Sequence, residues 1–236
     1  MKAILFDLDG TLLSLDFNKF FTRYMEDLCE YLSEFINRDQ LKDDIIASVY
    51  VAVDDTNAGR TVEDAFSQEF IRRRGGDWAA LKPLLDRYYL ERFDLLGDLA
   101  QQIPQIPEMI KSLKARGYQL IIATNAVFPR QAILCRLGWA GLDAADFTFI
   151  ADYESMHYCK PHLRFYREIL DRVGLFPEDC AMVGNNAVED MVPRKLGMPT
   201  YFITDEAIYN GVTPDCDWKG DRGEFIQLMM DLPPCR

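Results

Sequence analysis

The sequence predicts an α/β fold in which a doubly wound parallel sheet forms the core and an α-helical cap domain is inserted. Short apolar segments alternate with helical patterns, and one long stretch near the N-terminus holds helical patterns only. The 236 residues suffice for one core with a smaller insert. We expect the core at residues 1–14 and 100–236 and the cap at residues 15–99.

Five segments have the composition of strands that are buried on both faces. They are short, apolar and rich in β-branched or aromatic residues. They are Lys2–Phe6, Tyr118–Thr124, Phe147–Ala151, Cys180–Val183 and Thr200–Ile203. Strands of this kind, separated by helices, form the right-handed crossovers of a Rossmann-like sheet. Ligands bind such sheets at the carboxyl ends of the strands.

The helices of the predicted core have clear end signals. Pro107 is suited to begin a helix that Gly117 ends, and Pro161 to begin one that ends at Gly174. A third helix is expected at about 188–196, directly before Gly197.

The predicted cap contains four amphipathic helices and no strand. The first carries aromatic and aliphatic residues at helical spacing, most of which we expect in the helix core. Thr61 and Asp64 form a plausible capping box for the third. The four ranges are Phe17–Ile36, Leu41–Val53, Thr61–Arg73 and Leu84–Leu95, followed by a return linker at Gly97–Pro107.

Composition excludes several classes of partner and site. A formal net charge of −12 disfavours binding to nucleic acid or to an anionic membrane surface. Six cysteines occur without a CxxC pair, so a zinc site or a disulfide framework is not indicated. The first apolar run ends at Asp7, too early for a signal peptide or a membrane span. We therefore expect a cytoplasmic protein whose fold begins at Met1.

The strongest chemical signal is the string Asp7-Leu8-Asp9-Gly10-Thr11 at the end of the first predicted strand. Two carboxylates separated by one residue, followed by glycine, are able to point toward one place as the chain turns. One carboxylate is then placed to attack while the other transfers protons. The alternative interpretation is an ordinary acidic turn, which Asp and Gly also favour.

This string resembles the opening motif of phosphatases in the haloacid dehalogenase superfamily, and the other motifs follow in order. Thr124 ends the next core strand and precedes Asn125 and Ala126; the resemblance implies that the hydroxyl and the following amides hold phosphoryl oxygens. Lys160, before Pro161, stands where the family has its lysine. An ammonium there would offset phosphate charge and favour an ionised nucleophile.

The fourth motif departs from the pattern of the family. Asp190 stands where its last acid is usual, but Asn185 replaces its first Asp. An amide oxygen still suits Mg²⁺, although it brings no negative charge. Metal affinity is therefore expected to be weaker, unless Glu189 compensates.

The resemblance implies a magnesium-dependent phosphatase that acts on a small phosphorylated metabolite, as a monomer or homodimer. Asp7 would attack phosphorus and form an aspartyl-phosphate, and Asp9 would protonate the leaving oxygen and then activate water. Gly10 would contribute to phosphate binding. Mg²⁺ would be held by Asp7, the backbone carbonyl of Asp9, Asn185 and Asp190.

Two alternatives remain open, and the cap offers candidates for substrate binding. A phosphomutase shares these core motifs, and a non-catalytic metabolite-binding relative would follow if Asn185 abolished turnover. A dehalogenase is disfavoured because Asp9 is present. A phosphonate-cleaving enzyme would need a cap lysine that forms a Schiff base, and Lys19 has the character of a solvated surface residue instead. Phe17 and Arg60 are the cap residues predicted to contact substrate.

Overall fold

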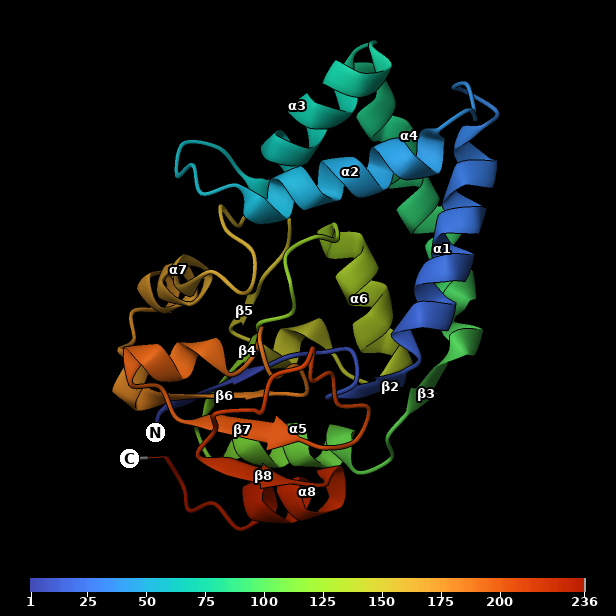
Figure 1. The fold of residues 1–236 in the computed structure, drawn as a ribbon. Helices are drawn as coiled ribbons and strands as arrows, with labels where there is room; N and C mark the ends of the chain where they lie inside the picture. The colour runs from blue at the N-terminus through green and yellow to red at the C-terminus, as the bar shows by residue number, and fades with distance from the viewer. Residues whose placement is uncertain (236) are drawn as a thin grey trace.

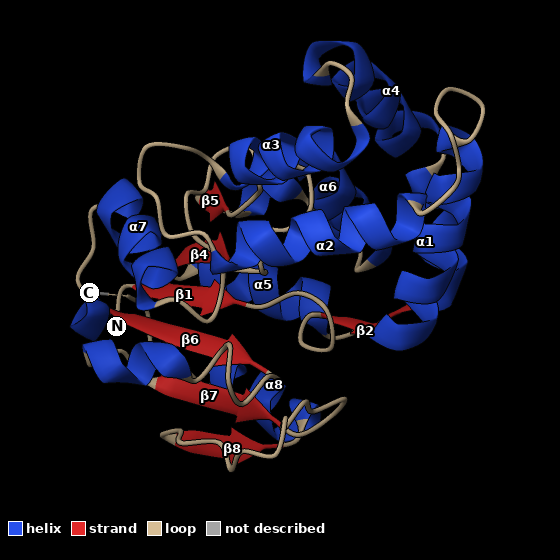
Figure 2. Cartoon of the chain, turned by 45° about the horizontal axis from the view of Figure 1, so that its top comes forward, coloured by secondary structure: helices blue, strands red, loops and turns tan. Residues whose placement is uncertain are grey.

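The computed structural model describes residues 1–235, and its core is a six-stranded sheet in the order β5-β4-β1-β6-β7-β8 (Figure 2). Every neighbouring pair is parallel. The strands are β1 (Ala3–Phe6), β4 (Gln119–Ile122), β5 (Phe149–Ile150), β6 (Cys180–Gly184), β7 (Thr200–Ile203) and β8 (Trp218–Gly220). The predicted parallel α/β sheet is confirmed.

Helices cover both faces of this sheet. Phe6 belongs to an apolar cluster with α5 (Ile106–Ala115) and α8 (Arg222–Met230), whereas its neighbour Leu5 packs in a second cluster with α7 (Leu163–Val173). Successive side chains of a strand point to opposite faces, so β1 is buried from both sides. This burial explains its uninterrupted apolar sequence.

The strand order changes direction at β1, which places a crevice at its carboxyl end. From β1 the chain continues to β4 and β5 on one side, then crosses to β6, β7 and β8 on the other. Helices that leave such a point diverge to opposite faces, and ligands bind in the gap between them. The string that begins at Asp7 lies directly after β1.

The helices of the segment predicted to form a cap lie over this edge of the sheet, at the top of Figure 1, and the segment is called the cap below. It consists of α1 (Phe17–Leu32), α2 (Leu41–Asp54), α3 (Val62–Arg74), α4 (Trp78–Glu91) and the 3₁₀ helix η1 (Phe93–Leu99). Its helical character agrees with the sequence, and Thr61 and Asp64 form the predicted capping box. Among residues 1–235, no helix is both long and apolar enough to cross a membrane.

Two short strands that the sequence did not reveal join the cap to the core. β2 (Leu13–Leu15) pairs antiparallel with β3 (Ala100–Gln102), so the outgoing and returning chains run side by side. Each strand has only three residues, and β3 is polar, which leaves no alternating apolar pattern to detect.

Several predicted elements differ in the structure. The helix expected at 188–196 is wrong: turns lead into a 3₁₀ helix, η4 (Val192–Leu196). The Asn186 side chain accepts from the backbone N–H groups of Val188 and Glu189 at 3.1 and 3.2 Å, which satisfies these groups within a turn. The last cap helix begins earlier than predicted, at Trp78. Besides β2 and β3, the elements without a counterpart in the prediction are α6 (Arg130–Trp139), α8, β8, η2 (Ala144–Asp146) and η3 (Pro177–Asp179).

Candidate active site

The fold brings the residues of the four sequence motifs to the carboxyl edge of the sheet. Asp7, Thr124 and Asn185 follow β1, β4 and β6 and line one cleft. Lys160, from the loop after β5, donates from Nζ to Asp7 Oδ1 at 2.8 Å and to Asp190 Oδ1 at 2.6 Å. Residues separated by up to 183 positions therefore meet at one place.

Lys160 is the cation that holds the two carboxylates together. Its side chain is only 1% exposed, so an uncompensated charge there would be costly. Burial alone would lower the pKa of Lys160, but Asp190 and Asp7 outweigh burial and raise that pKa well above its usual value. The lysine therefore stays protonated, and its charge compensates Asp7 and Asp190.

Asn125 fixes the position of Lys160 through the backbone. Its Oδ1 accepts the N–H of Lys160 at 3.1 Å, and its Nδ2 donates to Glu189 Oε2 at 3.3 Å. The Tyr166 hydroxyl donates to the carbonyl oxygen of Glu189 at 2.7 Å. Both polar atoms of the Asn125 side chain therefore form hydrogen bonds that hold the loops of the site in place. Ala126 is fully buried and offers only its backbone amide to a ligand.

Asn185 lines the cleft, and hydrogen bonds orient its side chain. Its Nδ2 donates to the backbone oxygen of Glu206 at 2.8 Å. Its Oδ1 lies 3.4 Å from the Thr11 hydroxyl, which is also 3.4 Å from Asp7 Oδ2. Gly10 permits this arrangement, because a Cβ at that position would lie 2.1 Å from Asn185 Nδ2.

The side-chain oxygens that converge in the site suit a hard cation, although few of them carry a negative charge. Among residues 1–235, no three His, Cys, Asp or Glu side chains are grouped to hold a metal ion. The acids that converge are Asp7 and Asp190, and Asn185 adds a neutral oxygen where a third acid would stand. These side chains offer oxygens only, which Mg²⁺ prefers, so they fit this ion with reduced charge.

Arg136 is a functional candidate that the sequence reasoning missed. Its side chain, from α6, is fully buried and forms an ion pair with Asp9, and its guanidinium lies 4.4 Å from the centre of the Phe128 ring. Asp9 Oδ1 and Arg136 Nη2 are both buried without a hydrogen-bond partner. Burial raises the pKa of Asp9 above its ordinary value, and Arg136 opposes this shift. Because Ala132, Ile133 and Leu137 share its buried helix face, the helical spacing was the available signal.

The cleft around these residues has a volume of about 890 Å³ and extends to the start of the cap. Phe17, one of the two predicted cap contacts, lines it. Arg60, the other, is not among the lining residues, because it donates to Asp55 and Gln68 at 2.7 Å each. The positive charge of Arg60 is therefore paired with Asp55 within the cap.

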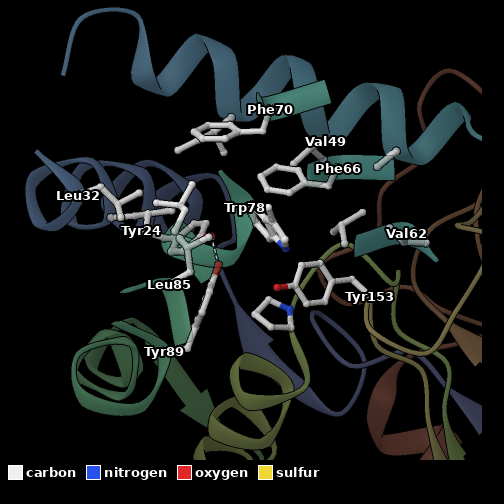
Figure 3. Close-up of a pocket in the computed structure, with 16 residues that line it drawn as sticks. Tyr24, Leu32, Val49, Val62, Phe66, Phe70, Trp78, Leu85, Tyr89 and Tyr153 are labelled. Atoms are coloured by element: carbon white, nitrogen blue, oxygen red, sulfur yellow. Dashed lines mark hydrogen bonds between the residues drawn. The ribbon is translucent and has the colours of Figure 1, made fainter. Parts of the chain in front are cut away.

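A second, smaller cavity of about 50 Å³ lies among the cap helices, with core loops forming one wall (Figure 3). Its lining is mostly aliphatic and aromatic and contains no charged side chain. The hydroxyl groups of Tyr24 and Tyr89, on one side of the cavity, form a hydrogen bond of 2.6 Å. Val127 lines both this cavity and the cleft. Without a charged group, the cavity is unsuited to phosphoryl transfer.

Comparisons with known proteins agree with this geometry. Residues 1–192 match the family of haloacid dehalogenase-like hydrolases. The pyrophosphatase PpaX of Bacillus cereus is 24% identical over 204 residues, which cover 86% of this chain and 83% of the relative. PpaX of Bacillus mycoides is 23% identical over the same length, with 86% and 84% covered.

Solved structures share the fold at low identity. A HAD phosphatase from Thermococcus onnurineus aligns with a TM-score of 0.61 at 20% identity, with both chains fully covered. An L-2-haloacid dehalogenase from Xanthobacter autotrophicus aligns at 0.55 and 13% identity, with 98% and 99% covered. The family match extends over most of the chain and includes the string at Asp7 and the residues at Asn185. The chain therefore belongs to the haloacid dehalogenase-like hydrolases.

Proposed function

We propose that the protein is a magnesium-dependent phosphatase that hydrolyses a phosphate monoester of a small metabolite. The observation that carries this proposal is the contact of Lys160 with both Asp7 and Asp190 at the mouth of β1, with Asp9 two residues away. A carboxylate beside a buried ammonium is a nucleophile whose charge does not repel an approaching phosphoryl group.

The chemistry divides between the two acids of the first motif. An oxygen of Asp7 attacks phosphorus and forms an aspartyl-phosphate as the bond to the leaving oxygen breaks, and Asp9 gives that oxygen a proton. Asp9 then takes a proton from water as the water attacks phosphorus, which releases phosphate and restores Asp7. Thr124 and the amides after it would hold the phosphoryl oxygens.

Asp7, Asp190, Asn185 and the backbone carbonyl of Asp9 would hold Mg²⁺. When bound, the ion supplies positive charge that offsets repulsion between the carboxylates and the phosphoryl group. Glu189 lines the same cleft and is available as a further oxygen donor.

Asp9 favours phosphate over halide as the leaving group. An alkoxide needs a proton when it leaves, whereas a halide does not. The dehalogenases among the structural neighbours share the fold with this chain, but fold alone does not assign chemistry. The relatives named pyrophosphatases support phosphoryl transfer in general.

The test is release of inorganic phosphate from an aryl phosphate and a panel of phosphorylated metabolites that includes pyrophosphate. We expect activity that requires Mg²⁺ and is lost in Asp7→Asn, while Asp54→Asn, an exposed acid at the end of α2, serves as the matched control. A folded protein that releases no phosphate at millimolar Mg²⁺ would contradict the proposal. Transfer of phosphate within the substrate, without release, would indicate a phosphomutase instead.

A further inference from the structure

We infer that the cleft selects phosphate esters whose leaving group is neutral or positively charged, and rejects a leaving group with a second anionic charge. The inference rests on the proposed phosphatase function and adds a substrate class to it. It follows from which charges line the cleft and which of them are already paired.

The lining of the cleft is strongly acidic. Among the residues that the structure describes, six acidic side chains line it, and Arg136 is the one cationic side chain in the lining. The acidic residues are Asp7, Asp9, Asp16, Glu189, Asp190 and Glu206. A divalent cation and one phosphoryl group would occupy the inner end, so the leaving group would lie nearest to Asp16 and Glu206, whose cationic partners do not line the cleft.

The two buried cations of the site are not available to a second anion. Lys160 is held between Asp7 and Asp190 at 2.8 and 2.6 Å. Arg136 is fully buried and ion-paired with Asp9. An anionic leaving group would have to break one of these pairs in a buried place, which leaves a carboxylate uncompensated.

The cations near the rim are paired as well. Arg222, with a side chain 11% exposed, donates to the Gly10 carbonyl oxygen at 2.8 Å and to Glu206 at 3.2 Å. The Lys19 side chain is 78% exposed, and its Nζ lies 3.2 Å from Asp16 Oδ2. Lys19 does not line the cleft. Neither residue presents an unpaired charge to the cleft.

The remaining rim is suited to a neutral or cationic group. Phe17, at the start of α1, is 40% exposed and stacks on Phe21 with the ring centres 5.9 Å apart. Asn18 and Asn210 line the cleft beside it and offer uncharged hydrogen-bonding groups. An exposed aromatic ring next to a carboxylate suits an alkyl chain or a cation on its face.

This substrate class differs from the one that the name of the PpaX relatives gives. Pyrophosphate has a phosphate as its leaving group, which carries negative charge. At 24% identity, the residues around the leaving group are free to differ while the reacting residues stay. Pyrophosphate is therefore expected to be a poor substrate for this chain.

The test uses three esters of equal length: 2-hydroxyethyl phosphate, 2-aminoethyl phosphate and phosphoglycolate. We expect kcat/KM for phosphoglycolate to be lower than for the other two by about tenfold or more at low ionic strength, because like charges repel within a Debye length of about 10 Å. Added salt should narrow the difference. A kcat/KM for phosphoglycolate that equals or exceeds the others would overturn the inference.

A variant that changes the charge at the rim of the cleft tests whether this charge causes the low kcat/KM for phosphoglycolate. Asn18→Lys places a cation among the lining residues and should raise kcat/KM for phosphoglycolate several-fold relative to 2-hydroxyethyl phosphate. Gln105→Lys, exposed at the start of α5 and outside the lining, is the matched control and should not change this ratio. An unchanged ratio in Asn18→Lys would also overturn the inference.

Direct binding distinguishes failure of this inference from failure of the proposed function. If the wild-type protein releases phosphate neither from the three esters nor from the aryl phosphate and the metabolite panel, the phosphatase proposal fails. The affinities of the same esters, measured by thermal shift with Mg²⁺ present, then decide the inference alone. Weakest binding of phosphoglycolate supports it, and equal or tighter binding of phosphoglycolate refutes it.

Discussion

Replacing Asn185 by aspartate restores the residue usual in the family, yet the structure predicts a less stable protein without metal. Asn185 is 2% exposed, and its Nδ2 donates to the Glu206 carbonyl oxygen at 2.8 Å. An aspartate has no donor at this position. It would instead place an oxygen, charged unless it takes up a proton, against a backbone oxygen in a buried place.

The size of the loss follows from these contacts. Replacing the amide by a carboxylate removes the donor of this hydrogen bond and leaves the buried oxygen at position 185 facing the Glu206 carbonyl oxygen, which costs about 1–3 kcal/mol. Asn185→Asp should therefore lower the free energy of unfolding by about 1–3 kcal/mol in EDTA. For a chain of this size, the midpoint of thermal unfolding should fall by roughly 2–12 °C.

The assay is thermal unfolding in EDTA and in millimolar Mg²⁺. Mg²⁺ should raise the midpoint more in Asn185→Asp than in the wild type, because the new carboxylate adds charge to the cation site. Asn186→Asp is the matched control: Asn186 Oδ1 only accepts, from Val188 and Glu189, and a carboxylate does the same. If Asn185→Asp in EDTA is as stable as this control, the reasoning is refuted.

Three further variants test single features of the fold and the site. In Gly184→Ala, the new Cβ would lie 2.2 Å from Asp190 Oδ2, so urea unfolding should show a loss of about 1–3 kcal/mol; no loss would mean that the Asp190 side chain moves freely. Lys160→Met leaves Asp7 and Asp190 uncompensated and should cost about 3–5 kcal/mol at neutral pH. This cost should shrink toward about pH 5, because burial raises the pKa of Asp190 to about 7 and the protonated acid needs no cation; a cost independent of pH would contradict the prediction. Burial raises the pKa of Glu154 to about 7 from an ordinary 4.5, so the folded state holds this proton more tightly and stability is lost as the pH rises between these values. Glu154→Gln should therefore be more stable than the wild type by about 1–2 kcal/mol at about pH 8, after discounting for partial exposure, and similar at about pH 5; thermal unfolding at both values checks the sign.

The central strands and most cap helices could be predicted because burial leaves a pattern in the sequence. A strand covered on both faces, such as β1 or β6, must be apolar throughout, and a cap helix must carry an apolar stripe. The edge strand β8 has three residues, Trp218, Lys219 and Gly220, and its middle residue is charged. Its strand character comes from pairing with β7, which the sequence does not display.

The residues of the site also fall into those that the sequence could predict and those that it could not. Asp7, Thr124 and Asn185 follow predicted strands, so the geometry of a parallel sheet brings them together without coordinates. The ion pair of Arg136 with Asp9 spans 127 positions and depends on how α6 packs against the core. A buried arginine signals that some acid must lie opposite, but the identity of that acid is set by tertiary packing alone.

Asn185 and the acidic cleft have a common electrostatic explanation. Six acidic side chains already line the cleft, and a seventh at position 185 would add to the repulsion that a phosphoryl dianion meets there. Two unit charges about 6 Å apart at an effective dielectric constant of about 20 interact by roughly 3 kcal/mol, which is an upper bound in a hydrated cleft. We therefore expect the neutral oxygen of Asn185 to lower metal affinity and to raise affinity for the phosphoryl group. Asn185→Asp should bind Mg²⁺ more tightly and yet, at saturating Mg²⁺, be inhibited less by inorganic phosphate. Inhibition by phosphate that is unchanged or stronger in this variant would show that the metal, and not the total charge of the cleft, governs binding of the phosphoryl group.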